Sequence, residues 1–298
     1  MSIEFEQRLK AYQQMVHEAL PGFLPAGDLP QRKVVEAMEY SLTAGGKRVR
    51  AVLLLHFCSL CGGSVQDALP FAAALEMIHA YSLIHDDLPC MDDDDMRRGK
   101  PSCHIAFGEA NALLAGDGLL TLAFETMLAD RNITALGAGR VLRAAATLAS
   151  AAGVGGMIGG QVIDLESENR QIDAERLSTI HRLKTGALIR AAARMGCILA
   201  GADDAITAKA DSYAENLGLA FQVVDDILDV VADPALLGKP VGSDSGNHKT
   251  TYVTLYGLDR SREIVKDYVL AADLAIKGSV LDDSFLYELA DMLADREY

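Results

Sequence analysis

The sequence predicts an all-α protein that forms a single domain over residues 1–298. Long Ala- and Leu-rich segments carry apolar residues at helical spacing, whereas the alternating β-branched runs typical of strands are scarce. Half of the residues are hydrophobic, so a chain of this length can bury a large core. No low-complexity linker or change of composition divides the chain, and we therefore expect one domain.

Glycine pairs and prolines set the expected helix boundaries. The first helix follows Pro30 and stops at Gly45-Gly46, and the second runs from about Lys47 to Gly62-Gly63, because glycine readily ends a helix. Further helices are expected over residues 65–88, 105–129, 138–152, 156–168, 173–200, 204–232, 249–277 and 283–295. Between the helices expected over 204–232 and 249–277, residues 234–249 form the longest loop, and loops of this length are often functional.

The charge balance excludes several classes of partner. The chain has 27 Lys and Arg against 42 Asp and Glu, a net charge of −15, which argues against nucleic acid and against docking to an anionic membrane. No apolar stretch approaches the length of a membrane span, since Arg190 and Arg194 interrupt the best candidate. Five cysteines and the lack of a signal peptide predict free thiols in a soluble, cytoplasmic protein.

The first chemical signature is an aspartate cluster after an apolar helix. Six of the ten residues from 86 to 95 are aspartates, and a solvated acidic turn is the simplest interpretation. However, His79, Ser82 and Asp86 share one face of the preceding helix. Asp92 lies about 120° out of phase with Asp86 on a regular helix, so the chain must distort near Pro89 if the two carboxylates are to converge.

The second signature is a polar stripe on the helix over 204–232. From Leu217 to Val231 nearly every residue is apolar except Gln222, Asp225, Asp226 and Asp229, which follow i, i+3, i+4, i+7 spacing. A helix that is apolar on most sides is buried, and buried carboxylates without partners are very costly. We therefore favour a stripe that lines a cavity and meets a cation over a helix cap or a surface stripe.

Oxygen-only ligands without a His or Cys set suit a hard ion, Mg²⁺ or Mn²⁺. Mg²⁺ usually binds through one or two carboxylates together with substrate phosphates. Carboxylates about 4 Å apart repel by ~1 kcal/mol in water and ~4 kcal/mol at an intermediate dielectric. We therefore expect the aspartates to be loosely arranged without metal and phosphate.

Cations suited to phosphate lie in other segments of this acidic chain. Taken singly, each is most often an exposed solubilising charge, but together they indicate an anion site separate from the carboxylates. They are Lys47, Arg48 and Arg50 after Gly45-Gly46, Arg97-Arg98, Lys184 beside Thr185, Lys239 and Lys249.

These motifs resemble those of the trans-isoprenyl diphosphate synthases. Asp86-Asp87-x4-Asp92 with Arg97-Arg98, and Asp225-Asp226-x2-Asp229, match the two aspartate-rich motifs of that family. The first motif has the four-residue gap of the bacterial farnesyl diphosphate synthases. Further sequence elements that match the family, in the same order, are Gly45-Gly46-Lys47-Arg48-x-Arg50, His79, Gly160-Gln161-x2-Asp164, Lys184-Thr185, Phe221-Gln222 and Gly238-Lys239.

The resemblance implies a bundle of ten or more helices around a central substrate cavity, usually a homodimer. It implies that three Mg²⁺ ions bridge an allylic diphosphate to Asp86 and Asp92 on one wall and Asp225 on the other. Asp87, Asp226 and Asp229 complete the two acidic motifs and are counted with them as residues of the metal site. The allylic ligands would be Arg97, Lys184, Thr185, Gln222 and Lys239, and those of isopentenyl diphosphate Lys47, Arg50, His79 and Arg98.

The chemistry implied is head-to-tail condensation of dimethylallyl or geranyl diphosphate with isopentenyl diphosphate. The allylic C–O bond ionises, the apolar cavity shields the cation from water, and the π bond of isopentenyl diphosphate attacks it. The catalytic residues would be Asp86, Asp92, Arg97, Lys184, Asp225 and Lys239.

Product length is expected to depend on Tyr81 and its neighbour Ser82. Tyr81 lies five residues before Asp86, about 7.5 Å along the helix, where its ring could close the tunnel; ordinary core packing is the alternative. In the family, an aromatic residue here goes with farnesyl diphosphate as the main product. A C20 (geranylgeranyl) product, a non-catalytic subunit of a heteromeric synthase, a terpene cyclase and a simple cation-binding protein are the competing hypotheses.

Overall fold

The computed structural model describes residues 1–231 and 250–295 and confirms the all-α prediction. Within these ranges the β structure consists of an antiparallel hairpin, β1 (Met96–Arg97) and β2 (Lys100–Pro101). The helices are α1 (Ile3–Ala19), the 3-10 helix η1 (Leu20–Phe23), α2 (Arg32–Leu42), α3 (Val49–Leu60), α4 (Val65–Asp86), α5 (Cys103–Phe107), α6 (Glu109–Met127), α7 (Asp130–Leu136), α8 (Ala138–Ala152), α9 (Met157–Ser167), α10 (Ala174–Ile180), the π-helix η2 (His181–Gly186), α11 (Ala187–Ala200), α12 (Asp204–Val231), α15 (Tyr252–Tyr256), α16 (Leu258–Ile276) and α17 (Ser284–Ala294).

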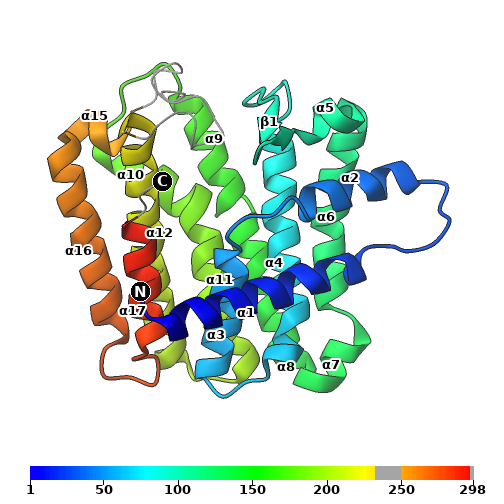
Figure 1. The fold of residues 1–298 in the computed structure, drawn as a ribbon, viewed down its shortest axis with the longest axis horizontal. Coiled ribbons are helices and arrows are strands. Elements are labelled where there is room, and N and C mark those ends of the chain that lie inside the picture. Colours follow the sequence, from blue (N-terminus) through cyan, green and yellow to red (C-terminus); the bar gives the residue numbers. More distant parts are fainter. Residues whose placement is uncertain (232–249, 296–298) are drawn as a thin grey trace.

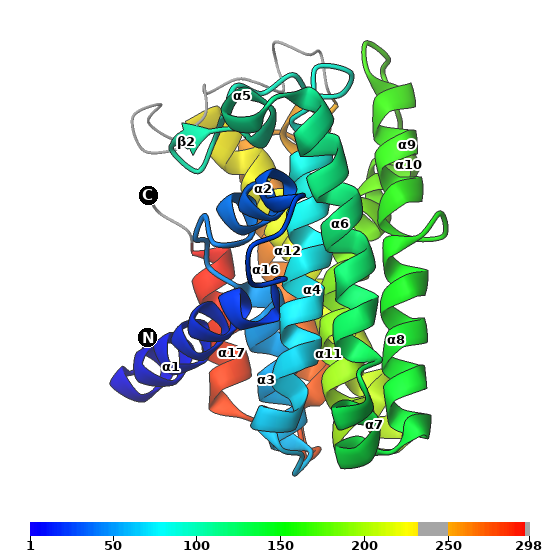
Figure 2. The same cartoon turned by 90° about the vertical axis from the view of Figure 1, so that its right-hand side faces the viewer.

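The helices form a bundle in which α4 and α11 occupy the middle (Figures 1 and 2). α4 packs against α3 and α6, α11 packs against α3, α8 and α12, and α16 covers α12 from outside. The core is dominated by buried side chains of these helices, among them Phe57, Phe71 and Tyr213. The Tyr213 hydroxyl donates to the Leu286 carbonyl oxygen at 2.7 Å, so this large ring is buried without an unsatisfied polar group.

Most expected helices are present, but three of them are interrupted. Gly108 and Gly257 adopt φ of +85° and +77°, which is favourable for glycine and incompatible with a continuous α-helix. They separate α5 from α6 and α15 from α16, so the single helices expected over 105–129 and 249–277 are wrong in this respect. The helix expected over 173–200 is divided by the widened turn η2.

α1, α7 and the β hairpin were not predicted from the sequence. α1 had a readable signal, because Phe5, Tyr12 and Val16 are buried along one face and the Ser2 side chain accepts from the Phe5 amide as an N-cap. The hairpin had none, since each strand is only two residues long. The expected loop over 234–249 lies outside the described residues.

One apolar stretch is long enough to be tested as a membrane span. Ala138–Ser167 passes on length and mean hydropathy, although 39% of its window is buried in the protein. In the structure this stretch is two helices, α8 and α9, separated by a turn at Gly153–Gly156, and α8 packs on α11. Since a core helix of a soluble protein passes the same test, the stretch is weak evidence for a span.

Candidate active site

The first aspartate motif begins where α4 ends. The Asp92 amide donates to the Asp86 carbonyl oxygen at 2.8 Å, and the Leu88 carbonyl oxygen accepts from the Met91 amide at 2.8 Å. The chain therefore turns back immediately after α4, and Asp92 lies beside Asp86 rather than farther along a helix. This is the distortion that convergence of the two residues required.

The surroundings of Asp86 disfavour the ionised form of its carboxyl group. Burial raises its pKa to about 6, and the neighbouring Asp92 and Asp87 push it in the same direction, while Lys184 and Arg97 oppose them. The influence of Lys184 means that η2 approaches the end of α4. A bound cation would relieve the repulsion among these three carboxylates.

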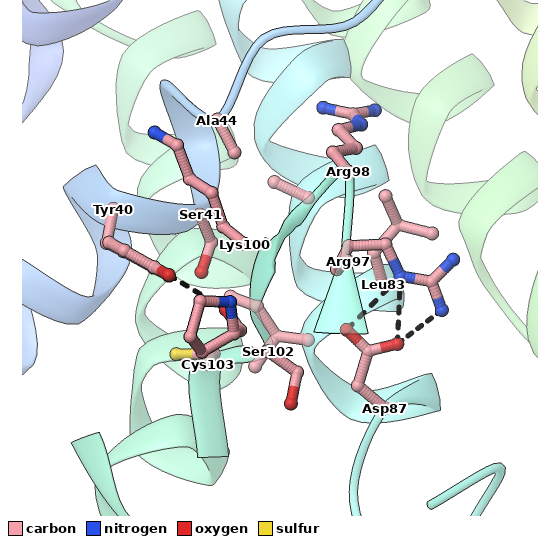
Figure 3. Close-up of a pocket in the computed structure, with 13 residues that line it drawn as sticks. Tyr40, Ser41, Ala44, Leu83, Asp87, Arg97, Arg98, Lys100, Ser102 and Cys103 are labelled. Atoms are coloured by element: carbon pink, nitrogen blue, oxygen red, sulfur yellow. Dashed lines mark hydrogen bonds and ion pairs between the residues drawn. The ribbon is translucent and has the colours of Figure 1, made fainter. Parts of the chain in front are cut away.

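Asp87 differs from Asp86 because a guanidinium already neutralises it. Asp87 is 2% exposed, and Arg97 Nε donates to both of its carboxylate oxygens at 2.9 and 3.2 Å, while Arg97 Nη2 donates to Oδ1 as well (Figure 3). Arg97 also contacts Asp94 at 3.1 Å. These contacts orient Arg97 at the end of α4, where the predicted allylic diphosphate would lie.

A second set of contacts holds the β hairpin that carries Arg97 and Arg98. The Tyr40 hydroxyl of α2 donates to the Pro101 carbonyl oxygen at 2.8 Å. Beside this contact, a small pocket is lined by residues of α2, α4 and the hairpin (Figure 3). The hairpin is thus fixed to two helices, and both arginines are held near the acidic end of α4.

The second aspartate motif lies near the end of α12. The Gln222 side chain donates to Asp225 at 3.4 Å, and both side chains are half-buried, as is Asp229. Asp226 is buried and accepts from the Tyr252 amide at 2.7 Å, so it caps the start of α15. α4 and α12 both end at the upper end of the bundle in Figure 1, which brings the two acidic motifs to one end of the molecule.

Lys184 and Thr185 lie in η2, the widened turn between α10 and α11. Lys184 Nζ donates to Asp164 Oδ2 of α9 at 2.7 Å. π-turns within helices are rare and occur frequently at functional sites. The side-chain-free surface of Gly160 faces the Lys184 backbone, so α9 can approach η2 closely enough for this ion pair.

The four predicted ligands of isopentenyl diphosphate line one cavity. We call this space the basic cavity; its lining residues include Lys47, Arg50, His79 and Arg98. Burial and the nearby arginines, led by Arg50 and Arg98, hold the pKa of His79 well below its ordinary value. His79 is therefore a neutral imidazole that can donate one N–H to an anion without adding charge.

Two further charged residues among those described line the basic cavity, Arg48 and Glu76. Arg48 is 7% exposed and has φ of +51°, a left-handed conformation that costs a non-glycine residue roughly 1–2 kcal/mol. Arg48 was predicted from the sequence among the cations suited to phosphate but not as a ligand of isopentenyl diphosphate, and Glu76 was not predicted. A usable signal existed, because Glu76 interrupts an apolar helix three residues before His79 and shares its face.

Tyr81 is 5% exposed and packs in the core. Its ring meets the His85 ring edge-to-face at 5.7 Å, and its hydroxyl has no hydrogen-bond partner among the described residues. Burial raises its pKa to about 12. The Ser82 hydroxyl donates to the His79 carbonyl oxygen at 3.0 Å. Of the two residues predicted to limit product length, Tyr81 has the larger side chain.

The described aspartates do not form a ready metal cluster. Within residues 1–231 and 250–295, no three His, Cys, Asp or Glu side chains form a group that could hold a metal ion. Their oxygen donors and the raised pKa of Asp86 nevertheless fit Mg²⁺, which needs few protein ligands when phosphates supply the rest. Lys239, which was predicted to bind the allylic diphosphate, and Lys249 lie outside the described residues.

A family model described as polyprenyl synthetase matches residues 31–274. The chain belongs to this family. Over 298 residues it is 46% identical to "Farnesyl diphosphate synthase" of Escherichia coli (strain K12), covering 99% of each chain, and the predicted resemblance is confirmed. Two solved structures have TM-scores of 0.87: an FPP/GFPP synthase from Zymomonas mobilis, 35% identical and covering 99% of this chain and 100% of that chain, and a geranylgeranyl pyrophosphate synthetase from Pyrococcus horikoshii, 31% identical and covering 99% of each chain.

Proposed function

We propose that this polyprenyl synthetase family member is a prenyltransferase that condenses allylic diphosphates with isopentenyl diphosphate and releases mainly farnesyl diphosphate. One observation carries the proposal. Lys47, Arg50, His79 and Arg98, which come from three separate segments, line the same cavity next to the acidic end of α4. A cavity lined by these three cations and a neutral imidazole that can donate a hydrogen bond is suited to a diphosphate.

The allylic diphosphate is assigned to the end of the bundle where the two acidic motifs lie. Asp86, Asp92 and Asp225 would hold Mg²⁺, which supplies neutralisation of the departing diphosphate. Arg97 and Lys184 add positive charge on this side, and both lower the pKa of Asp86. Thr185 and Gln222 would orient the diphosphate through hydrogen bonds, and Lys239 remains a predicted ligand.

The chain's own groups then perform the remaining tasks. Arg97, anchored by Asp87, holds charge where the leaving diphosphate develops it, and such preorganised groups need no reorganisation during the reaction. Neutral His79 orients the second diphosphate by donating a hydrogen bond. Apolar residues between the two subsites, such as Phe221 and Ile189 at the wall of the basic cavity, exclude water from the allylic cation.

Product sizing tests this proposal directly. The purified chain is incubated with Mg²⁺, isopentenyl diphosphate and dimethylallyl diphosphate, and the dephosphorylated products are sized by chromatography. A C15 product is expected. A C20 product would support the geranylgeranyl alternative, a hydrocarbon product would indicate a terpene cyclase, and no turnover would favour a non-catalytic subunit of a heteromeric synthase.

We also propose that the chain forms a homodimer through the α6 and α8 side of the bundle (Figure 2). Leu113 and Leu114 of α6 are 47% and 53% exposed, and Leu142 of α8 is 60% exposed. Exposed large apolar side chains are candidates for an interface with a second copy of the chain. Light scattering after gel filtration should give twice the chain mass, and Leu114→Glu should shift it toward the monomer. The cytoplasmic location stays a prediction.

A further inference from the structure

A buried ion pair joins Arg48 and Glu76 at the wall of the basic cavity. Arg48 Nη1 donates to Glu76 Oε2 at 2.8 Å, and the two side chains are 4% and 2% exposed. Arg48 Nη2 donates to the Leu42 carbonyl oxygen at 2.7 Å. The guanidinium is therefore fixed by the end of α2 on one side and by α4 on the other.

Arg48 also lies at the turn between Lys47 and Arg50. It adopts the left-handed conformation immediately before α3 begins at Val49. Two neighbouring carbonyl oxygens are held as well, that of Gly45 by Arg98 and that of Lys47 by Gln13 of α1. The Arg48 side chain thus ties the turn to α4, on which His79 lies one turn after Glu76.

Charge gives the pair a second role. Glu76 contributes the carboxylate among the described lining residues of the basic cavity, where Lys47, Arg50 and Arg98 contribute positive charge together with Arg48. Arg48 neutralises Glu76 at hydrogen-bond distance. Without Arg48, a buried carboxylate would face the incoming anion from the cavity wall and repel it.

We propose that Arg48 and Glu76 are positioning residues for isopentenyl diphosphate. The pair fixes Lys47 and Arg50 relative to His79, and it keeps the Glu76 charge from opposing the diphosphate. This inference rests on the proposed function. A pair that only stabilised the fold would lower the melting temperature without distinguishing between the two substrates.

Steady-state kinetics of three variants test the proposal. Arg48→Met should raise the KM for isopentenyl diphosphate about tenfold and leave the KM for geranyl diphosphate within about twofold. Glu76→Gln should raise the former about threefold. In the double variant the KM should fall back below that of Arg48→Met, because the uncompensated carboxylate is gone. Equal changes in both KM values, or additive effects in the double variant, would overturn the proposal.

If Arg48→Met folds poorly, its KM values still test the proposal, because KM does not depend on the concentration of active enzyme. Arg48→Lys keeps the positive charge but loses the simultaneous contacts with Glu76 and the Leu42 carbonyl oxygen. Arg48→Lys should raise the KM for isopentenyl diphosphate alone, about threefold; unchanged KM values for both substrates would overturn the proposal.

A matched control is the pair of Arg190 on α11 and Asp211 on α12, which are joined at 2.6 and 2.9 Å. Asp211 lies 14 residues before Asp225 on α12, so about 21 Å away along the helix. Asp211→Asn should lower the melting temperature and leave both KM values unchanged. If the wild-type chain shows no turnover, the proposed function fails. Calorimetric titration with isopentenyl diphosphate then tests the pair separately, and equal affinity for wild type and Arg48→Met would overturn its role.

Discussion

Gly160 of α9 and Lys184 of η2 are in backbone contact. A β-carbon on Gly160 would lie 2.2 Å from the Lys184 amide nitrogen and 2.6 Å from its Cα. Such distances cannot be accommodated by moving the end of a flexible side chain, because the opposing atoms are backbone. The contact sets the separation of α9 and η2, and with it the reach of Lys184 toward Asp164 and Asp86.

Gly160→Ala should therefore displace η2 and impair the allylic subsite. We expect a loss of about 1–3 kcal/mol in the free energy of unfolding and a fall in kcat/KM of about tenfold or more. Denaturant unfolding and steady-state kinetics measure the two effects. Gly139→Ala on α8 is the control, since no atom lies within 4 Å of its added β-carbon; equal behaviour of the two variants would contradict the role of the contact.

Removal of the acidic groups should separate activity from stability. Asp86→Ala and Asp225→Ala should each lower kcat/KM by at least about a hundredfold. The melting temperature of Asp86→Ala should not fall, because burial and neighbouring carboxylates already raise the pKa of Asp86 to about 6 and disfavour its ionised form. Thermal unfolding and turnover are compared with Glu125→Ala, an exposed carboxylate of α6. Near-normal turnover in either variant would refute metal binding by these groups.

Tyr81→Ala should lengthen the product. The ring is buried one and a half turns before Asp86, and its removal opens space along α4 toward the core. Tyr81→Phe is the matched control: it keeps the ring and removes a hydroxyl that has no partner in the described structure, so product length should not change. Product chromatography measures both, and unchanged length in Tyr81→Ala would exclude the ring as the stop.

Asp273 on α16 should make stability depend on pH. Burial, followed by repulsion from Asp291, raises its pKa from 3.8 to about 6. The folded state therefore binds more protons than the unfolded state between these values, and stability falls as pH rises through that window. Asp273→Asn should raise the melting temperature at about pH 8 and much less at about pH 4. Asp267→Asn, which removes a largely exposed carboxylate on the same helix, should lack this pH-dependent gain.

Local patterns predicted most of the fold. The apolar periodicity of α4, α8 and α12 follows from the need to bury one or more faces, and glycine pairs marked the limits of α2 and α3 correctly. Single glycines were harder to interpret. Gly108 and Gly257 break helices through a positive φ, whereas Gly160 lies within α9 and serves its packing.

The candidate site was predictable where sequence motifs match those of a known family, and hidden where tertiary contacts decide. The resemblance to that family assigned Lys47, Arg50 and His79 to isopentenyl diphosphate, and these residues line one cavity. By contrast, two contacts join residues that are far apart in the sequence. Asp226 caps α15 through Tyr252, 26 residues away, and Glu76 pairs with Arg48, 28 residues away. Such partners are chosen by packing, which a single sequence does not reveal.

The widened turn η2 also resets the rotational phase of the chain. Because a π-turn absorbs one additional residue, the helix that follows is rotated by roughly 100° relative to an uninterrupted one. A helical wheel drawn continuously from α10 into α11 would therefore assign Arg190 and Arg194 to the wrong side. Deletion of one residue within η2 would restore regular α-helical winding and rotate either Lys184 or all of α11 away from its present neighbours. The extra residue is therefore needed to align both helices at once.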